Sequence, residues 1–184
     1  ADVIRQLRIG TVLDPALAAT GPDREEAVAA AREQGVPVRM IRAGSEFKAG
    51  GLALRALWPP DPGSPAEDPN LNALVLVATY GETDVFLPAD AESDVTARLP
   101  LDEVELLKVA HHGSADPGLD EELRVLRPRI AVISCGRNND YGHPRAETLA
   151  ALAGSPGLAL YRTDTDGRVV VESDGRRIQV HTQS

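Results

Sequence analysis

The chain has 184 residues, and 19 Lys and Arg against 28 Asp and Glu give it a formal net charge of −9. Its length fits about one domain, and a hydrophobic content of 42% is usual for a globular protein. The acidic balance argues against nonspecific coating of nucleic acid, and 3% aromatic residues leave little material for base-stacking platforms. A nucleic-acid enzyme is not excluded, because bound metal ions can reverse the local charge.

The sequence shows no sign of membrane insertion or of disulfide formation. Apolar runs stay shorter than the ~18 residues that a membrane span requires. The first ten residues lack the basic and apolar regions of a signal peptide. Cys135 is the one cysteine, so an intramolecular disulfide is impossible. We therefore expect a single acidic domain without a signal peptide or transmembrane segment.

The first half of the chain alternates helical and extended patterns. A helix with proline at its start and a glycine after its end separates two short strands, which favours a parallel pair joined by a crossover. Turn residues then predict a hairpin and a proline-rich loop. The expected elements are a helix at Ala1–Leu7, a strand at Ile9–Leu13, a helix at Pro22–Glu33, a strand at Val36–Ile41, hairpin strands at Glu46–Lys48 and Leu52–Leu57, and a loop at Pro59–Pro69.

The second half predicts further strands that alternate with helices, and it ends in a hairpin. Together the two halves indicate a layered α/β fold in which helices cover sheets. The expected elements are strands at Ala73–Thr79 and Asp84–Leu87, a helix at Glu92–Leu99, a strand at Val104–Ala110, a helix at Leu119–Leu126, a strand at Ile130–Ser134, a helix at Pro144–Leu152, and strands at Leu158–Tyr161, Arg168–Glu172 and Arg177–His181.

Two adjacent histidines, His111 and His112, follow the most apolar strand of the chain directly. Polar residues at the carboxyl end of such a strand lie at the sheet edge where α/β proteins bind ligands. Adjacent side chains on an extended backbone point to opposite sides, so both imidazoles can face one site only if the chain turns, which Gly113 and Ser114 permit. The alternative is a turn with two solvated imidazoles.

Asp90 holds the equivalent position one strand earlier. Its carboxylate could bind a metal ion to which imidazoles supply nitrogen ligands. The alternative role is an N-cap of the Glu92–Leu99 helix. The pairing with His111 and His112 about twenty residues later favours the metal-binding interpretation.

His143 precedes Pro144, which we expect at the first position of a helix. A histidine near a helix amino end could donate to a phosphate or to a leaving oxygen. A simple capped helix after a polar loop explains the pattern equally well. The segment 163–167 has the composition of a turn. We expect His181 to be structural or exposed, and neither Lys108 nor Cys135 indicates a function.

Several motifs in order along the chain resemble one family. These are Leu106–Ser114 (LLKVAHHGS), Pro128–Gly136 (PRIAVISCG), Tyr141–Pro144 (YGHP) and Tyr161–Gly167 (YRTDTDG). They resemble the carboxyl-terminal metallo-β-lactamase-like domain of the ComEC/Rec2 competence proteins. The resemblance implies an αββα sandwich that binds divalent metal, Zn or Mn, through Asp90 and one of the two histidines, His111 or His112.

The same resemblance implies a function. It places His143 beside the metal as a catalytic residue, and it suggests phosphodiester hydrolysis of the DNA strand that is not imported. The partners would be DNA and the rest of a multipass membrane channel, with no small-molecule cofactor. The chain would then be a soluble domain of a bacterial inner-membrane protein.

The chain also departs from the family pattern. The ligand motif His-x-His-x-Asp-His is absent, so we expect residues 1–184 to form an amino-terminally truncated, partial domain with an incomplete metal site. Pro88-Ala89 stands where the family has Thr-Gly, which predicts an altered turn before Asp90. By itself the chain should have little nuclease activity and weak metal affinity. The alternatives are a non-catalytic module that docks on a channel or partner and, less favoured, a small-molecule hydrolase.

Overall fold

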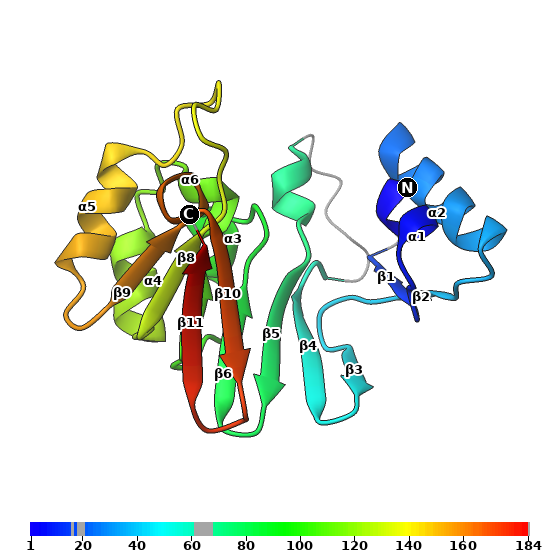
Figure 1. The fold of residues 1–184 in the computed structure, drawn as a ribbon, viewed down its shortest axis with the longest axis horizontal. Helices are drawn as coiled ribbons and strands as arrows, with labels where there is room; N and C mark the ends of the chain where they lie inside the picture. The colour runs from blue at the N-terminus through cyan, green and yellow to red at the C-terminus, as the bar shows by residue number, and fades with distance from the viewer. Residues whose placement is uncertain (16, 18–20, 61–67, 184) are drawn as a thin grey trace.

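A seven-stranded sheet forms the centre of the protein (Figure 1). The computed structural model describes residues 1–15, 17, 21–60 and 68–183. The strands lie in sequence order across the sheet, β3-β4-β5-β6-β7-β8-β9. Their bounds are β3 Glu46–Ala49, β4 Leu52–Trp58, β5 Val75–Tyr80, β6 Thr83–Leu87, β7 Leu106–Lys108, β8 Ile130–Ile133 and β9 Ala159–Arg162.

The sheet is antiparallel from β3 to β6 and parallel from β6 to β9. In the parallel half, Val85 is aligned with Leu106, Leu106 with Ile130, and Ile130 with Ala159. The carboxyl ends of β6, β7, β8 and β9 therefore share one edge of the sheet. The loops that leave this edge carry the residues that the sequence singled out.

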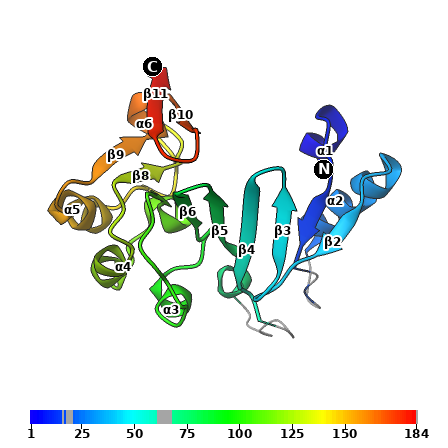
Figure 2. The ribbon, with the colours of Figure 1, turned by 90° about the horizontal axis from the view of Figure 1, so that it is seen from below.

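Helices cover one face of the sheet and a hairpin covers part of the other (Figure 2). Apolar strand residues such as Phe86, Leu107 and Ile133 are fully buried under the helices in one continuous core. This burial is the main source of stability, because each large apolar side chain contributes about 1.5–3 kcal/mol. The helices are α3 Ser93–Thr96, α4 Leu119–Leu126 and α5 Ala146–Gly154, and the hairpin strands are β10 Arg168–Ser173 and β11 Ile178–Gln183.

The β10–β11 hairpin is fastened to the turn between β5 and β6. The hydroxyls of Thr83 and Ser173 lie 2.8 Å apart, and the amide of Glu82 donates to the carbonyl of Gly175 at 2.6 Å. A Cβ on Gly81 would lie 2.5 Å from that carbonyl oxygen, so only glycine permits this contact. The hairpin thus forms a second layer over the central sheet.

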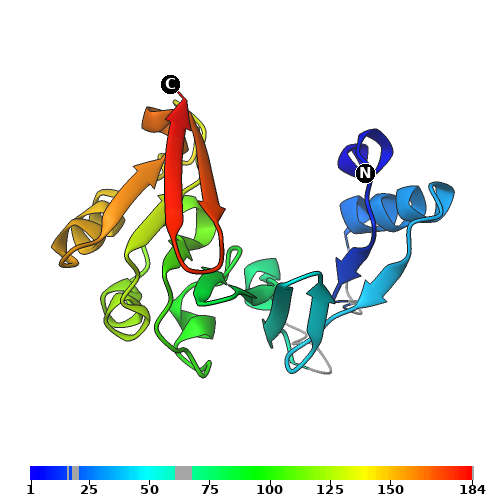
Figure 3. The same cartoon turned by 60° about the horizontal axis from the view of Figure 1, so that its bottom comes forward.

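The amino-terminal residues form a small α/β unit beside β3 (Figure 3). Helix α2 connects β1 to β2, and these two strands pair in parallel. A short core of Ile4, Ala30 and Ala31 lies between the helices, and the half-exposed Arg24 forms a bidentate ion pair with the buried Asp14. The bounds are α1 Asp2–Gln6, β1 Val12–Asp14, α2 Pro22–Glu33 and β2 Val38–Met40.

Most predicted elements are present, and α2 and α4 have the predicted bounds. The prediction for Pro144 was wrong: α5 begins at Ala146 with Arg145 as N-cap, so Pro144 lies before the helix. The structure does not support the alternative role of Asp90 as an N-cap, because Glu92 holds that position on α3. The proline-rich loop falls largely on 61–67, outside the described residues. Among the helices that are described, none combines the length and hydropathy needed to cross a bilayer.

Candidate metal-binding and catalytic site

A tight turn after β6 presents Asp90. Ala89 has a φ of +55°, a left-handed conformation that costs a residue with a Cβ about 1–2 kcal/mol. Its carbonyl accepts hydrogen bonds from the amide of His111 and from the Nζ of Lys108, both at 3.1 Å. Burial lowers the pKa of Lys108, and the negative charge of Asp90 opposes this effect. The turns after β6 and β7 are thereby joined directly to each other.

The chain turns at the two histidines themselves. The φ angles of His111 and His112 are +44° and +55°, and Gly113 follows at +85°. A Cβ on Gly113 would lie 2.7 Å from the Cβ of Pro144, so glycine is required for the close approach of the two loops. The left-handed turn removes the alternation of an extended strand. It lets both imidazoles face residues at the same sheet edge.

His112 lies opposite Asp90. Its Nε2 is 3.7 Å from the Asp90 Oδ1, while its Nδ1 lies 2.6 Å from the carbonyl oxygen of Ser134. A protonated Nδ1 donating to this carbonyl leaves the Nε2 lone pair directed at the carboxylate side. Metal-binding histidines commonly have this arrangement, in which a backbone carbonyl fixes the tautomer and the ring orientation.

His111 lies between Glu92 and His143. Its Nδ1 is 3.1 Å from the Glu92 Oε1, and its ring meets the His143 ring edge to face with centroids 5.7 Å apart. Desolvation lowers the pKa of His143, and the nearby His111 and Arg145 act in the same direction. The His143 imidazole is therefore neutral at pH 7 and able to accept a proton.

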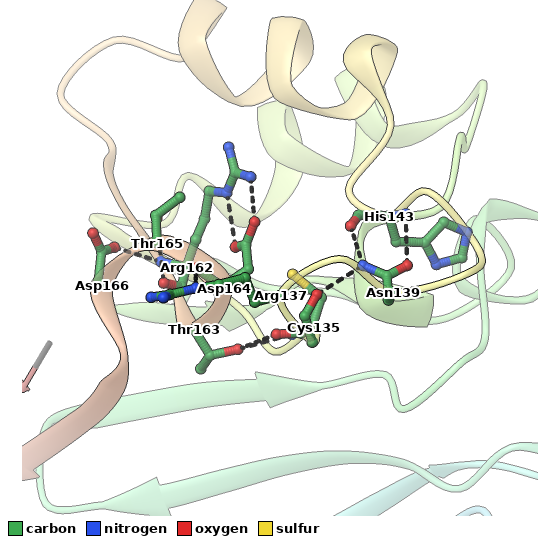
Figure 4. A network of polar contacts seen from close by, with 10 residues as sticks. Cys135, Arg137, Asn139, His143, Arg162, Thr163, Asp164, Thr165 and Asp166 are labelled. Atoms are coloured by element: carbon green, nitrogen blue, oxygen red, sulfur yellow. Dashed lines mark hydrogen bonds and ion pairs between the residues drawn. The ribbon is translucent and has the colours of Figure 1, made fainter.

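The loop that carries His143 is closed by one side chain, Asn139. Its Nδ2 donates to the carbonyls of Gly136 at 2.9 Å and His143 at 2.6 Å, and its Oδ1 accepts from the His143 amide at 3.0 Å (Figure 4). Both backbone polar groups of His143 are thus held by Asn139. The amide of Arg145 in turn donates to the carbonyl of Gly113 at 2.8 Å, which binds the loop to the histidine turn.

The segment after β9 fixes the base of the same loop. The Thr163 hydroxyl donates to the Cys135 carbonyl at 2.8 Å and accepts from its amide at 2.9 Å, and Arg162 forms a bidentate ion pair with Asp164 (Figure 4). Hydrogen bonds from Arg162 hold the pKa of Asp164 below its usual value. Thr163–Asp166 forms one helical turn, α6, so this segment has a positioning role beyond an ordinary turn.

The structure brings the four predicted site residues to one sheet edge as two contacting pairs, Asp90 with His112 and His111 with His143. Ligands of a tetrahedral zinc ion lie about 3.3 Å apart, since each bond is about 2.0 Å long. The 3.7 Å between Asp90 and His112 therefore fits two ligands of one ion. No group of three metal-binding side chains is found in the described part of the chain.

Sequence reasoning missed several supporting residues of this site. The sequence predicts an ordinary helical position for Glu92 and no role for Lys108. It places Asn139 in a polar loop and among the motifs that resemble the family, without indicating its contacts with the backbone of His143. A glutamate at the start of a short helix carries no signal for a contact nineteen residues away. The run Asn138-Asn139-Asp140, with Gly142 two residues later, does indicate a tight loop, and it could have directed attention to Asn139.

Comparison with solved structures identifies the fold. A crystal structure of a protein from Parabacteroides distasonis, described as a metal-dependent hydrolase, matches with a TM-score of 0.53 and 13% sequence identity. The match covers 89% of this chain and 80% of that one. At this identity the likeness concerns the fold alone, and it confirms the predicted metallo-β-lactamase type. No family model matches the sequence.

Comparison with curated proteins identifies relatives. The chain is 31% identical to ComE operon protein 3 of Bacillus subtilis over 151 residues, which is 80% of this chain and 19% of the relative. It is 29% identical to Recombination protein 2 of Haemophilus influenzae over 141 residues, 75% of this chain and 17% of the relative. The matched region thus spans less than a fifth of either relative. The relationship confirms the predicted resemblance, and the chain belongs to the ComEC/Rec2 family of competence proteins.

Proposed function

We propose that this chain forms part of a metal-dependent phosphodiesterase that acts on DNA. The observation that carries the proposal is the convergence of Asp90 and His112, with the second nitrogen of His112 held by a backbone carbonyl. One carboxylate and one imidazole suit zinc or manganese. His111 would be a further ligand through its Nε2, since its Nδ1 faces Glu92.

When bound, the ion would supply a water molecule of lowered pKa as the nucleophile. His143 is the proton carrier in this proposal. Its neutral imidazole could accept the proton that the attacking water loses and then, as the imidazolium, pass that proton to the leaving oxygen of the phosphodiester. Asn139 holds the backbone of His143, and the His111 ring limits its position from the side. These contacts would keep the proton carrier aligned with the metal ligands.

We further propose that residues beyond these 184 supply the remaining metal ligands. Each relative is more than four times as long as this chain. A catalytic zinc ion takes three protein ligands, and no group of three metal-binding side chains is found among the described residues. In this proposal the chain is a part, outside the bilayer, of a longer inner-membrane protein with a DNA channel. Its substrate would be the DNA strand that is not imported.

Metal binding and cleavage by the longest form of the protein that can be purified test the proposal. We expect stoichiometric Zn²⁺ or Mn²⁺ by elemental analysis and metal-dependent cleavage of labelled DNA. Asp90→Ala and His112→Ala should lower metal affinity at least tenfold and abolish cleavage. His181→Ala is the matched control, because His181 is exposed and paired only with Glu172 among the described residues. Absence of metal, or full cleavage by Asp90→Ala, would contradict the proposal.

A non-catalytic docking module is the second candidate. It is favoured by the lack of a three-ligand group among the residues that the structure describes. Ala89 also favours it, because a left-handed position just before Asp90 would suit glycine, and alanine there indicates that this turn is less strictly constrained than in an active metal site. Elemental analysis separates the two candidates, because a docking module would contain no stoichiometric metal even in its longest form.

A further inference from the structure

One aromatic side chain stands out at the mouth of the candidate site. Tyr141 is 76% exposed, the highest value among the exposed large hydrophobic side chains of the described residues. The whole chain has only two Phe, three Tyr and one Trp. Phe86 is fully buried in the core, and Trp58 packs against the core and donates to the Leu71 carbonyl. An exposed ring beside candidate catalytic residues calls for a functional explanation.

Tyr141 is the outermost of three neighbouring rings. Its ring lies 5.9 Å from the His143 ring at a tilt of 34°, and His143 meets His111 at 5.7 Å. The loop beneath it is not free to rearrange, because Asn139 makes three hydrogen bonds to loop backbone groups. Thr163 also fixes the backbone of Cys135 at the start of the loop. The tyrosine face is therefore presented in a set position next to the site.

On an otherwise acidic protein, one arginine lies next to Tyr141 in space and a second begins the loop that carries it. A Cβ on Gly142 would lie 3.4 Å from the Arg145 Nη1, so this guanidinium packs against the residue that follows Tyr141. Arg137 uses its Nε to donate to the carbonyl of Asp164, which leaves its terminal nitrogens available. Within the described residues, neither arginine forms an ion pair with a carboxylate. Asp140 is the one acidic residue between them in sequence.

We propose that Tyr141 stacks on an unpaired base of a nucleic-acid strand while Arg137 and Arg145 contact its phosphates. The inference rests on the proposed function and names its substrate class as single-stranded nucleic acid or an unpaired end. A base inside a duplex is covered on both faces by its neighbours and cannot stack on the tyrosine. Stacking on an aromatic side chain is worth about 1–3 kcal/mol per base, which corresponds to a five- to 150-fold change in affinity.

Binding without hydrolysis tests this inference. Fluorescence anisotropy in EDTA at low salt would compare three labelled probes: a twelve-nucleotide thymidine strand, the same strand with abasic residues, and a twelve-base-pair duplex. We expect the wild type to bind the thymidine strand at least fivefold more tightly than the other two. Tyr141→Ala should remove this preference, and Tyr141→Phe should retain it because the ring face is kept.

The matched control is Tyr80→Ala. Tyr80 is 41% exposed and ends β5, whose antiparallel pairing with β6 places it at the sheet edge opposite the site. We expect Tyr80→Ala to bind all probes like the wild type, provided that its thermal melt remains cooperative. Arg145→Gln should weaken binding to every probe and reduce the salt dependence, since phosphate contacts do not distinguish bases.

Two results would overturn the inference: a wild type that binds all three probes equally, or a Tyr141→Ala variant that keeps the preference for the thymidine strand. Equal binding of the three probes would instead favour a protein partner as the molecule that contacts the exposed Tyr141 ring. The outcome is separable from that of the proposed function. Base-dependent binding without metal-dependent cleavage would remove the phosphodiesterase proposal only, and metal-dependent cleavage by a protein that binds all three probes equally would remove this inference only.

Discussion

Glu122 on α4 should make the stability of this protein depend on pH near neutrality. Its side chain is buried at 6% exposure between α3 and α4, where the Thr96 hydroxyl donates to its Oε2 at 2.5 Å. Burial raises the pKa of Glu122 to about 7, the Thr96 hydrogen bond partly opposes this, and the negative charge of Asp116 adds to it. The folded protein therefore holds a proton on Glu122 that the unfolded chain releases near pH 4.5.

The sign and size follow from proton linkage. Because the folded pKa is the higher one, the stabilisation is fully present below pH 4.5 and is lost as pH rises through about 7. A shift of about 2.5 pKa units corresponds to about 3 kcal/mol in total, of which about 2 kcal/mol falls between pH 5.5 and pH 8. Asp164, with its lowered pKa, titrates below this range and contributes its own stability loss only in acid.

Urea unfolding at pH 5.5 and pH 8 measures this effect. We expect Glu122→Gln to remove about 2 kcal/mol of the pH dependence, whatever the fixed cost of the new amide. Glu121→Gln is the matched control, because Glu121 is exposed on the same helix and pairs with Arg124. The reasoning is refuted if wild type and Glu122→Gln change in parallel between the two pH values.

Three further substitutions test the turns around the site by urea unfolding. Ala89→Gly should stabilise by about 0.5–1 kcal/mol, since relief of the positive φ outweighs the extra chain entropy of glycine; a loss of stability would show that the turn is unstrained. Gly113→Ala should cost roughly 2 kcal/mol or more, because its Cβ would clash with Pro144 at a φ of +85°, and an unchanged midpoint would contradict this packing. Thr163→Val should cost roughly 1–3 kcal/mol by leaving the Cys135 amide and carbonyl unpaired, while Thr163→Ser should not; equal effects of both would refute the hydrogen bonds.

The sequence predicted elements whose ends have local causes. Pro22 and Gly35 delimit α2 because one fits the first helical turn and the other takes a positive φ of +66° after its end. The convergence of Asp90 and the histidines was also predictable, because parallel strands align their carboxyl ends. These predictions needed only residue spacing and general rules of topology.

Other features depend on tertiary contacts that local patterns do not record. The residue types of Ala89, His111 and His112 do not predict their left-handed backbone conformation. In the structure, a hydrogen bond from the His111 amide to the Ala89 carbonyl joins the two turns that contain them. The helix predicted to start at Pro144 starts two residues later, at Ala146. The amide of Arg145, just before this helix, donates a hydrogen bond to the Gly113 carbonyl, and the local sequence does not reveal this contact. Non-local contacts of this kind determine how the side chains of the site face one another.

If Asp90, His111, His112 and His143 together form one ion-binding edge of the sheet, NMR of the histidine rings during a Zn²⁺ titration should report it. The chain has four histidines, so each ring signal can be assigned by substitution and followed separately. We expect the His112 and His111 signals to shift, the His143 signal to follow through its contact with His111, and the His181 signal to stay in place. Asp90→Asn should suppress the His112 response. Zinc that shifts His181 as strongly as His112, or that moves none of the four signals, would contradict the claim.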